Sequence, residues 1–190
     1  KPMGTLEPLI GDTASRRYVE GWYKTLRGDH MTENAIALLK ANLQLILTGA
    51  PGTGKTHLAR EVAANLIGCK YDALDKNPQF RFVQFHPSYD YSDFVEGLKP
   101  RIVNGQVDLE LKDGIFKEFC KRAGQTPGTP FVFIIDEINR ADLSRVFGEL
   151  FYAIEQGYRG KPLSTQYSYI TKTDFNVPEN VFIVGTMNDI

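Results

Sequence analysis

The sequence of 190 residues has few cysteines and no long apolar run. Its two cysteines, Cys69 and Cys120, are far apart and lack metal-ligand spacing, which favours reduced structural thiols over a disulfide framework or a metal cluster. No apolar stretch approaches the roughly 20 residues that a bilayer span requires, and the first residues hold no apolar signal segment. The composition therefore predicts a soluble, cytoplasmic protein with no membrane contact.

A strong net charge is also lacking. Lysine and arginine total 22 and aspartate and glutamate 23, so the formal net charge is −1. This balance gives no general attraction to nucleic acid, and any DNA contact would come from a local patch or a partner chain. The hydrophobic fraction of 42% and the length suit one well-buried core, without repeats or low-complexity tracts. We expect one α/β domain.

Glycines gather in the sequence GAPGTGKT, residues 49–56. The apolar run 43–47 before it predicts a strand, and the amphipathic segment 57–67 after it predicts a helix that ends at Gly68. In this order, the glycines let backbone N–H groups approach a polyphosphate, and the helix adds the positive end of its dipole. Lys55 is expected to reach the β- and γ-phosphates, and the Thr56 hydroxyl to ligate Mg²⁺. The expected nucleotide-binding residues are Gly49, Ala50, Pro51, Gly52, Thr53, Gly54, Lys55, Thr56 and His57, the last as a first-turn helix residue beside the phosphates.

Two carboxylates follow the most apolar run of the chain. Residues 131–135 are all apolar and predict a strand covered on both faces. Asp136 and Glu137 come next, at the strand end where open α/β sheets bind ligands. Asp136 is expected to hold Mg²⁺ through its water shell, because Mg²⁺ prefers hard oxygen ligands. Glu137 is expected to orient and deprotonate an attacking water.

A polar amide ends the last apolar strand, residues 181–185, in the sequence Gly-Thr-Met-Asn188. Alone, Asn188 would be an ordinary loop residue. If its strand lies beside the phosphate-loop strand, the amide can bridge the γ-phosphate and the attacking water. The candidate catalytic residues are therefore Glu137, Asn188 and Lys55, and the candidate metal ligands are Thr56 and Asp136.

The remaining elements are predicted from periodicity and turn residues. Tyr18 and Trp22 lie on one face of the first predicted helix and are either core residues or a base-stacking platform. The segment Gly28–His30 is expected to end that helix, and Asp142 is expected to cap a later one. The expected elements are helices over 15–26, 32–41, 115–123 and 143–156, a strand over 80–85, a short helix over 92–97, a hairpin over 101–111 around Asn104-Gly105, and a polar excursion over 157–175 with a second hairpin as one alternative.

The three motifs, spread over residues 49–188, resemble the core of an AAA+ NTPase. More narrowly, FVQFHPSYDYSDFVEGL (82–98), FIIDEINRADLSRVFGEL (133–150) and VPENVFIVGTMND (177–189) resemble the McrB branch, the GTP-driven motor subunits of modification-dependent restriction systems. The resemblance covers about residues 40–190. MoxR-like chaperone ATPases share the DEINRA string, whereas HPSYDYSDFVEG favours McrB.

The resemblance implies a three-layer αβα P-loop NTPase fold with a mostly parallel sheet, hairpin insertions and the first strand beside the last. Residues 1–42 would be a helical lead-in and 43–190 the P-loop core of one nucleotide-binding domain, stopping before the last core strand and the helical lid. Asp136 and Glu137 match the family's Walker B pair, and Asn188 matches the asparagine of its Met-Asn sensor.

The implied function is Mg²⁺-dependent binding and hydrolysis of ATP or GTP, with no visible residue that reads the base. The implied partners of the full-length protein are further copies in a homo-hexameric ring, a McrC-like nuclease subunit and DNA, the last two through other domains. A MoxR-like chaperone and a nucleotide-dependent binding switch with little turnover are the alternatives. The 190 residues alone are expected to bind nucleotide as a monomer and to hydrolyse it slowly.

For three further side chains, the sequence leaves two alternative roles open. Arg140 could make a local ion pair or reach a neighbouring subunit's nucleotide. His86 and Tyr91 could fix the turn after the second strand or face a ring interface or pore.

Overall fold

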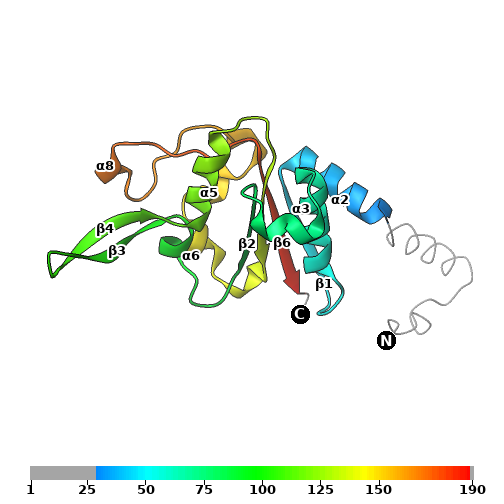
Figure 1. The fold of residues 1–190 in the computed structure, drawn as a ribbon, viewed down its shortest axis with the longest axis horizontal. Coiled ribbons are helices and arrows are strands. Elements are labelled where there is room, and N and C mark those ends of the chain that lie inside the picture. The colour runs from blue at the N-terminus through cyan, green and yellow to red at the C-terminus, as the bar shows by residue number, and fades with distance from the viewer. Residues whose placement is uncertain (1–28, 189–190) are drawn as a thin grey trace, which may run out of the picture.

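A four-stranded parallel sheet forms the centre of the computed structural model, which describes residues 29–188 (Figure 1). The strands lie in the order β1-β6-β5-β2, so β1 pairs with β6 as the family resemblance implied. Their bounds are Gln44–Gly49 for β1, Phe80–Gln84 for β2, Phe131–Asp136 for β5 and Val181–Asn188 for β6. All three pairings are parallel, so the carboxyl ends of the strands meet at one edge.

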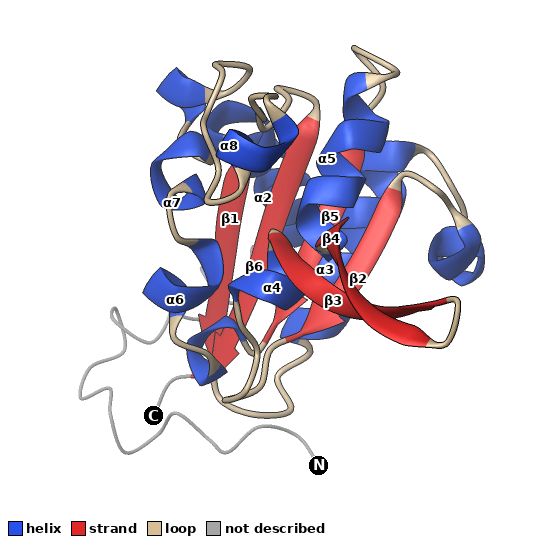
Figure 2. Cartoon of the chain, turned by 90° about the vertical axis from the view of Figure 1, so that its left-hand side faces the viewer, coloured by secondary structure: helices blue, strands red, loops and turns tan. Residues whose placement is uncertain are grey.

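Helices cover both faces of this sheet (Figure 2). Helices α2 (Asp29–Asn42) and α3 (Lys55–Ile67) pack on one face, and α4 (Tyr91–Phe94), α5 (Ile115–Gly124), α6 (Leu143–Phe147) and α7 (Leu150–Ala153) lie on the other. Side chains of β5 alternate between the two cores: Phe131, Phe133 and Ile135 join the aromatic core around α5, and Val132 and Ile134 the aliphatic core around α3. The three-layer αβα fold is confirmed.

A long hairpin projects from this body (Figure 1). Strands β3 (Glu96–Val103) and β4 (Gln106–Asp113) pair antiparallel along their full length. Asn104 (φ 51°) and Gly105 (φ 78°) both take the left-handed conformation that a two-residue type I′ turn requires. The hairpin predicted from Asn104-Gly105 is confirmed, although it is longer at both ends than predicted.

The predicted helix over 143–156 is wrong as a continuous element. Asp142 caps its start as expected, since the carboxylate accepts a hydrogen bond from Arg145 N at 3.2 Å. Gly148, at φ 51° and ψ −130°, then ends α6, and α7 starts afresh at Leu150. A Cβ at Gly148 would lie 3.0 Å from the Tyr91 ring, so tertiary packing also favours glycine there.

Other boundaries differ from the prediction. The short helix predicted over 92–97 is α4, capped by Asp90, and Gly97 lies in β3, where a Cβ would come within 2.4 Å of Ser92 Cβ. Within 157–175 the described backbone forms the short helix α8 (Ser168–Thr171) and one isolated bridge, Leu163–Phe175, so the second-hairpin alternative is wrong. Asp29 and His30 begin α2, contrary to the predicted break, and the helix predicted over 15–26 lies outside the described residues.

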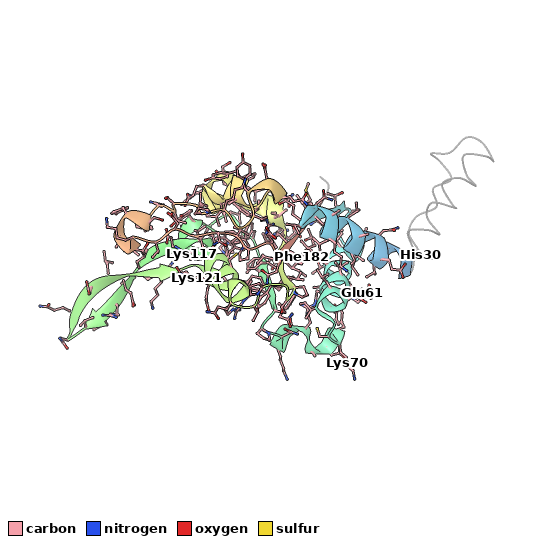
Figure 3. All side chains as sticks on the ribbon, turned by 90° about the horizontal axis from the view of Figure 1, so that it is seen from above. His30, Glu61, Lys70, Lys117, Lys121 and Phe182 are labelled. Carbon is pink, nitrogen blue, oxygen red and sulfur yellow. The ribbon has the colours of Figure 1, made fainter. Side chains whose placement is uncertain are left out.

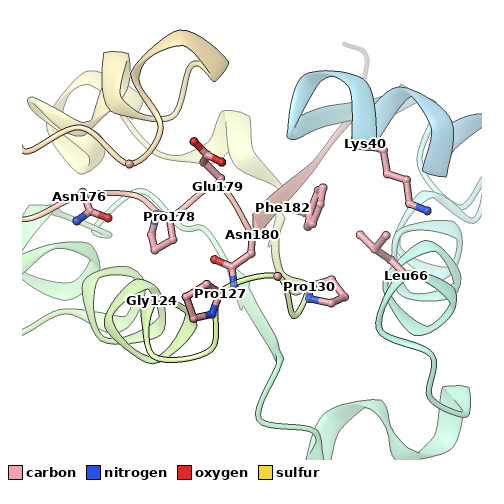
Figure 4. Close-up of a pocket in the computed structure, with 12 residues that line it drawn as sticks. Lys40, Leu66, Gly124, Pro127, Pro130, Asn176, Pro178, Glu179, Asn180 and Phe182 are labelled. Atoms are coloured by element: carbon pink, nitrogen blue, oxygen red, sulfur yellow. The ribbon is translucent and has the colours of Figure 1, made fainter.

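A cavity of about 740 Å³ lies at the amino ends of the strands, away from the three motifs (Figure 4). Lys40, Leu66 and Phe182 line one side of it, and Pro127 and Pro178 line the other. The amide of Asn180 donates to the carbonyl oxygens of Ala123, Thr126 and Thr129 at 2.7–3.1 Å. The polar side chain of Asn180 therefore holds the loop between α5 and β5 closed.

Within residues 29–188, no helix is long and apolar enough to span a bilayer.

Candidate functional site

The loop of residues 49–56 joins β1 to α3 at the carboxyl edge of the sheet. Its glycines have positive φ angles of 150° at Gly49, 77° at Gly52 and 86° at Gly54, which other residues rarely adopt. No side chain caps the first turn of α3, and that turn contains no acidic residue. Its backbone N–H groups can therefore meet an anion, and the helix dipole favours one. Ala50 and Pro51 form the exposed rim of this loop.

Lys55 folds its side chain back over the loop. Its Nζ donates to the carbonyl oxygens of Gly49 and Ala50, both at 2.8 Å, and lies 3.5 Å from Thr53 Oγ1. The ammonium is thus held among the backbone groups that would surround a polyphosphate. A phosphate oxygen would replace neutral carbonyl acceptors with a charged one, which makes a stronger hydrogen bond.

Asp136 brings the first two motifs together. Its Oδ1 accepts hydrogen bonds from Thr56 Oγ1 at 2.8 Å and from Thr186 Oγ1 at 2.6 Å. Thr56 and Asp136 are 80 residues apart in the sequence and were predicted as metal ligands on separate grounds. The geometry joins a hydroxyl and a carboxylate oxygen, the hard donors that Mg²⁺ prefers. Within residues 29–188, no three His, Cys, Asp or Glu side chains cluster as a metal site.

Glu137 has a strained backbone and a fully engaged carboxylate. Its φ of 55° and ψ of 44° place it in the left-handed region, which costs a non-glycine residue on the order of 1 kcal/mol. Its Oε1 accepts from Asn188 Nδ2 at 2.8 Å and its Oε2 from Arg140 Nε at 3.1 Å. Its own N–H donates to Thr186 Oγ1 at 3.2 Å. The two contacts from Asn188 and Arg140 fix the position of the carboxylate.

Asn188 is the last residue of β6 and pairs in register with Gly49, the last residue of β1. The role predicted for Asn188 requires its strand to lie beside the phosphate-loop strand, and β6 does pair with β1. The amide therefore lies between the start of the phosphate loop and the Glu137 carboxylate that it contacts. Asn139 Nδ2 also approaches the Asn188 carbonyl, at 3.4 Å.

His57 occupies the first turn of α3, but its ring is engaged with neighbours on the outer side. Nδ1 lies 3.1 Å from the Tyr71 hydroxyl and Nε2 lies 3.3 Å from the Glu61 carboxylate. These two contacts hold the ring between Tyr71 and Glu61, and the role of His57 beside the phosphates stays a prediction.

Two cavities flank the loop on the side of α2. One of about 380 Å³ is mainly apolar, with Met31, Ala35 and Leu38 of α2 facing Leu47 and Lys55. The other, of about 550 Å³, is more polar, and its lining residues are Met31, Thr32, Glu33, Thr53, Gly54, His57, Leu58, Glu61 and Asn65. Together they offer space next to the phosphate loop for a base and a sugar. Sequence reasoning did not place α2 beside the phosphate loop, because its amphipathic pattern indicates only a helix.

Thr186 is a residue of the candidate site that sequence reasoning did not single out. It is 2% exposed and contacts both Asp136 and Glu137. The available signal was its place two residues before Asn188, because alternate residues of a strand share a face.

The structure shows the contacts of the three side chains for which the sequence left two roles open. Arg140 makes the local ion pair with Glu137. The rings of His86 and Tyr89 pack edge to face, with centroids 5.4 Å apart, at the turn after β2. Tyr91 donates to the Glu149 carboxylate, and burial together with this carboxylate raises the tyrosine's pKa. These contacts support the prediction that His86 and Tyr91 fix the turn after β2.

Comparisons with known proteins place these features in context. The model of the AAA domain (dynein-related subfamily) matches residues 44–190. The chain is 45% identical over 159 residues to the type IV methyl-directed restriction enzyme EcoKMcrB subunit of Escherichia coli K12, an alignment that covers 82% of this chain and 32% of that protein. It is 27% identical over 177 residues to the type II restriction enzyme BsuMI component YdiS of Bacillus subtilis 168, covering 76% of this chain and 50% of that protein.

The chain therefore spans about a third to a half of the length of these curated relatives. A solved structure from Cytophaga hutchinsonii ATCC 33406 shares 18% identity over 84% of this chain and 38% of that one. Its TM-score of 0.44 is too low to carry an argument.

Proposed function

Because the chain belongs to the AAA domain family (dynein-related subfamily), in its McrB-like branch, we propose that it binds a nucleoside triphosphate with Mg²⁺ and hydrolyses it. The observation that carries this proposal is the meeting of Thr56, Asp136, Glu137 and Asn188 at one edge of the sheet. These residues come from three segments of the chain. Thr56 and Asp136 were selected from sequence as ligands of Mg²⁺, Glu137 as the base and Asn188 as the amide that bridges the γ-phosphate and the water. The proposed domain is one nucleotide-binding unit, with residues 1–42 as its lead-in and 43–190 as its core.

The phosphate-binding half of the proposal rests on the loop. The open N–H groups of α3 and the Lys55 ammonium would hold the β- and γ-phosphates. Thr56 and Asp136 fit Mg²⁺ because their oxygens already share a hydrogen bond of 2.8 Å. When bound, Mg²⁺ would neutralise charge on the phosphate oxygens.

The hydrolytic half rests on Glu137. One oxygen of this carboxylate must accept a proton from the attacking water, and the other must be held to fix its direction. Asn188 Nδ2 supplies the holding contact at Oε1. Arg140 occupies Oε2, and its side chain is 60% exposed, so it can leave without disturbing the core. We propose that departure of Arg140 frees Oε2 for the water.

We further propose that the whole protein is the motor subunit of a modification-dependent restriction system. It would act as a homo-hexameric ring in the cytoplasm, with a nuclease partner subunit and with DNA reached through other domains. The 45% identity to the EcoKMcrB subunit supports this over the MoxR-like chaperone and the passive switch.

The decisive experiment measures hydrolysis of ATP and of GTP by the full-length protein, with Mg²⁺ and with excess chelator. We expect Mg²⁺-dependent release of phosphate from one of the two nucleotides and stimulation by methylated DNA with the nuclease subunit. The absence of hydrolysis of both nucleotides, in a protein that binds them, would favour the passive switch. Stimulation by a protein client instead of DNA would favour the chaperone.

A further inference from the structure

A buried threonine, Thr186, lies between the candidate metal ligand and the candidate base. It belongs to β6, two residues before Asn188, and is 2% exposed. Figure 3, seen from above, shows Phe182 of the same strand between Lys117 of α5 and Glu61 of α3. The strand therefore runs through the interior of the fold, where a polar side chain must find its hydrogen-bond partners within the protein.

The pleat of the sheet determines which side chains the Thr186 hydroxyl meets. Val184 and Ile134 belong to the aliphatic core around α3. Alternate residues of a strand share a face, so Thr186 and Asp136, two positions further along their strands, face α3 as well. Thr56 lies in the first turn of this helix. The two threonines and the aspartate therefore meet on one face of the sheet.

The Thr186 hydroxyl acts as donor and acceptor at the same time. It donates its proton to Asp136 Oδ1 at 2.6 Å, and its oxygen accepts a hydrogen bond from Glu137 N at 3.2 Å. A hydroxyl has one donor and two acceptor lone pairs, so the two contacts are compatible. Thr56 Oγ1 donates to the same Asp136 oxygen at 2.8 Å. A continuous chain of hydrogen bonds therefore runs from the start of α3 to the backbone of Glu137.

The two partners of this hydroxyl depend on it to different degrees. Asp136 Oδ1 would keep the hydrogen bond from Thr56 if the Thr186 hydroxyl were removed. The Glu137 N–H would lose the acceptor that it has within residues 29–188. This loss falls on a residue with φ 55° and ψ 44°, a conformation that persists only where the surrounding structure holds it. The hydroxyl therefore matters more for the base than for the metal ligand.

We propose that Thr186 is a positioning residue for hydrolysis, whose hydroxyl holds the Glu137 backbone in its left-handed conformation. The inference rests on the proposed function, in which Glu137 is the base. Asn188 fixes one oxygen of the carboxylate, and Thr186 fixes the backbone from which that side chain extends. Both residues belong to β6, so one strand positions the base at two points. Thr186 acts on the attacking water only through Glu137.

The test compares three variants of the full-length protein. Thr186→Val replaces the hydroxyl with a methyl group and keeps strand propensity, whereas Thr186→Ser keeps the hydroxyl. Thr165→Val is the matched control for loss of a buried hydroxyl, because Thr165 is 6% exposed and its Oγ1 lies 3.0 Å from Ser168 Oγ, outside the candidate site. The rate of hydrolysis, the KM for nucleotide, the Mg²⁺ requirement and the unfolding midpoint are measured for each.

In Thr186→Val we expect kcat to fall by about tenfold or more, because a small displacement of a catalytic group is costly. The KM and the Mg²⁺ concentration for half-maximal activity should stay within about threefold of wild type, since Asp136 keeps its contact with Thr56. Thr186→Ser should recover most of the rate. Thr165→Val should lower the unfolding midpoint, as Thr186→Val does, but keep the wild-type kcat.

Two further measurements separate positioning of the base from a structural role. In a Glu137→Gln background, Thr186→Val should change the residual rate by less than about twofold, because the base through which it acts is already lost. Hydrogen exchange of the Glu137 amide, followed by mass spectrometry without nucleotide, should be faster in Thr186→Val than in wild type and unchanged in Thr186→Ser. This second readout does not depend on hydrolysis.

Other results overturn the inference. A wild-type kcat in Thr186→Val, or a loss of equal size in the Glu137→Gln background, removes Thr186 from the positioning of the base and leaves the proposed function intact. A raised Mg²⁺ requirement at unchanged kcat assigns the hydroxyl to the metal step instead. If Thr186→Val does not fold, Thr186→Ala takes its place with the same expected results. If the wild type hydrolyses neither ATP nor GTP, the proposed function fails together with this inference.

Discussion

The carboxyl edge of the sheet and the β3–β4 hairpin place polar and apolar side chains in opposite ways. At the edge, Asp136 and Asn188 end strands whose apolar residues are buried. Asn188 donates to the Glu137 carboxylate, and Thr186 donates to Asp136. In the hairpin, the apolar residues are outside, and the buried ion pair of Lys117 with Glu96, at the start of β3, fixes the root. The two regions therefore differ in what they expose. The edge exposes polar groups whose positions are fixed by the packed core, whereas the hairpin exposes apolar side chains that do not pack against the core.

The first prediction breaks the hairpin root. Lys117→Met leaves Glu96 buried without its cation, and breaking a buried pair costs about 3–5 kcal/mol. Urea unfolding should show a loss of this size. Lys121→Met is the matched control, because Lys121 lies in the same helix as Lys117, is 54% exposed and pairs with Asp113 at the end of β4. It should cost less than about 1 kcal/mol. Similar losses in the two variants would mean that the root is no stronger than a surface ion pair.

The second prediction breaks the edge without touching the fold. Glu137→Gln keeps the contact with Asn188 but removes the proton acceptor, so hydrolysis by the full-length protein should fall about 10²-fold or more. Nucleotide affinity should stay within threefold of wild type. Asp136→Asn should instead raise the Mg²⁺ concentration needed for half-maximal activity. A wild-type rate in Glu137→Gln would identify a different base.

The carboxyl edge of the sheet could be predicted from the sequence more completely than the rest of the fold. The strands and loop were predictable because a buried parallel strand needs a continuous apolar run, and 131–135 and 181–185 supply one each. The meeting of Thr56 with Asp136 followed from the rule that ligands bind at the carboxyl ends of such strands. Thr186 was missed because a threonine inside a strand has no distinguishing pattern.

Outside the edge of the sheet, the sequence prediction failed where tertiary contacts outweigh local sequence preferences. Gly148 ends α6 through its non-helical backbone at φ 51° and ψ −130°, and the Tyr91 ring lies 3.0 Å from where a Cβ would stand. Arg159 is 4% exposed and donates to the carbonyls of Ile154 and Val181, although its sequence context predicts a surface loop. Burial lowers its pKa to about 10. The hairpin itself was predicted from Asn104-Gly105, but the exposure of its apolar side chains follows only from the structure.

The third prediction sharpens the role of the loop. Lys55→Ala removes the ammonium that lies 2.8 Å from the Gly49 and Ala50 carbonyls, and triphosphate affinity should fall at least tenfold, about 1.4 kcal/mol. Lys70→Ala, at an exposed position after α3, is the control and should bind as wild type. A titration with unchanged affinity in folded Lys55→Ala would remove the loop from the nucleotide site.

The smallest expected effect is the acid sensitivity of the hairpin root. Burial alone would raise the pKa of Glu96, but hydrogen bonds from Lys117, Thr165 and Tyr167 N overcome this and lower it. A carboxyl whose folded-state pKa is lowered adds stability above its unfolded pKa, and that stability is lost as the pH falls toward the folded value. With an ordinary unfolded pKa of about 4.3, the loss between pH 6 and pH 4 is at most about 0.7 kcal/mol.

Unfolding free energies of wild type and Glu96→Gln, measured at both pH values, isolate this contribution. The variant is less stable at pH 6, because Lys117 loses the nearer of its two carboxylate partners, Glu96 and Asp113, and the gap to wild type should narrow by up to that amount at pH 4. Nucleotide affinity should not share this pH dependence, because Glu96 lies outside the nucleotide site. A gap that widens on acidification would reverse the sign of the Glu96 shift, and the root would then be held by burial alone.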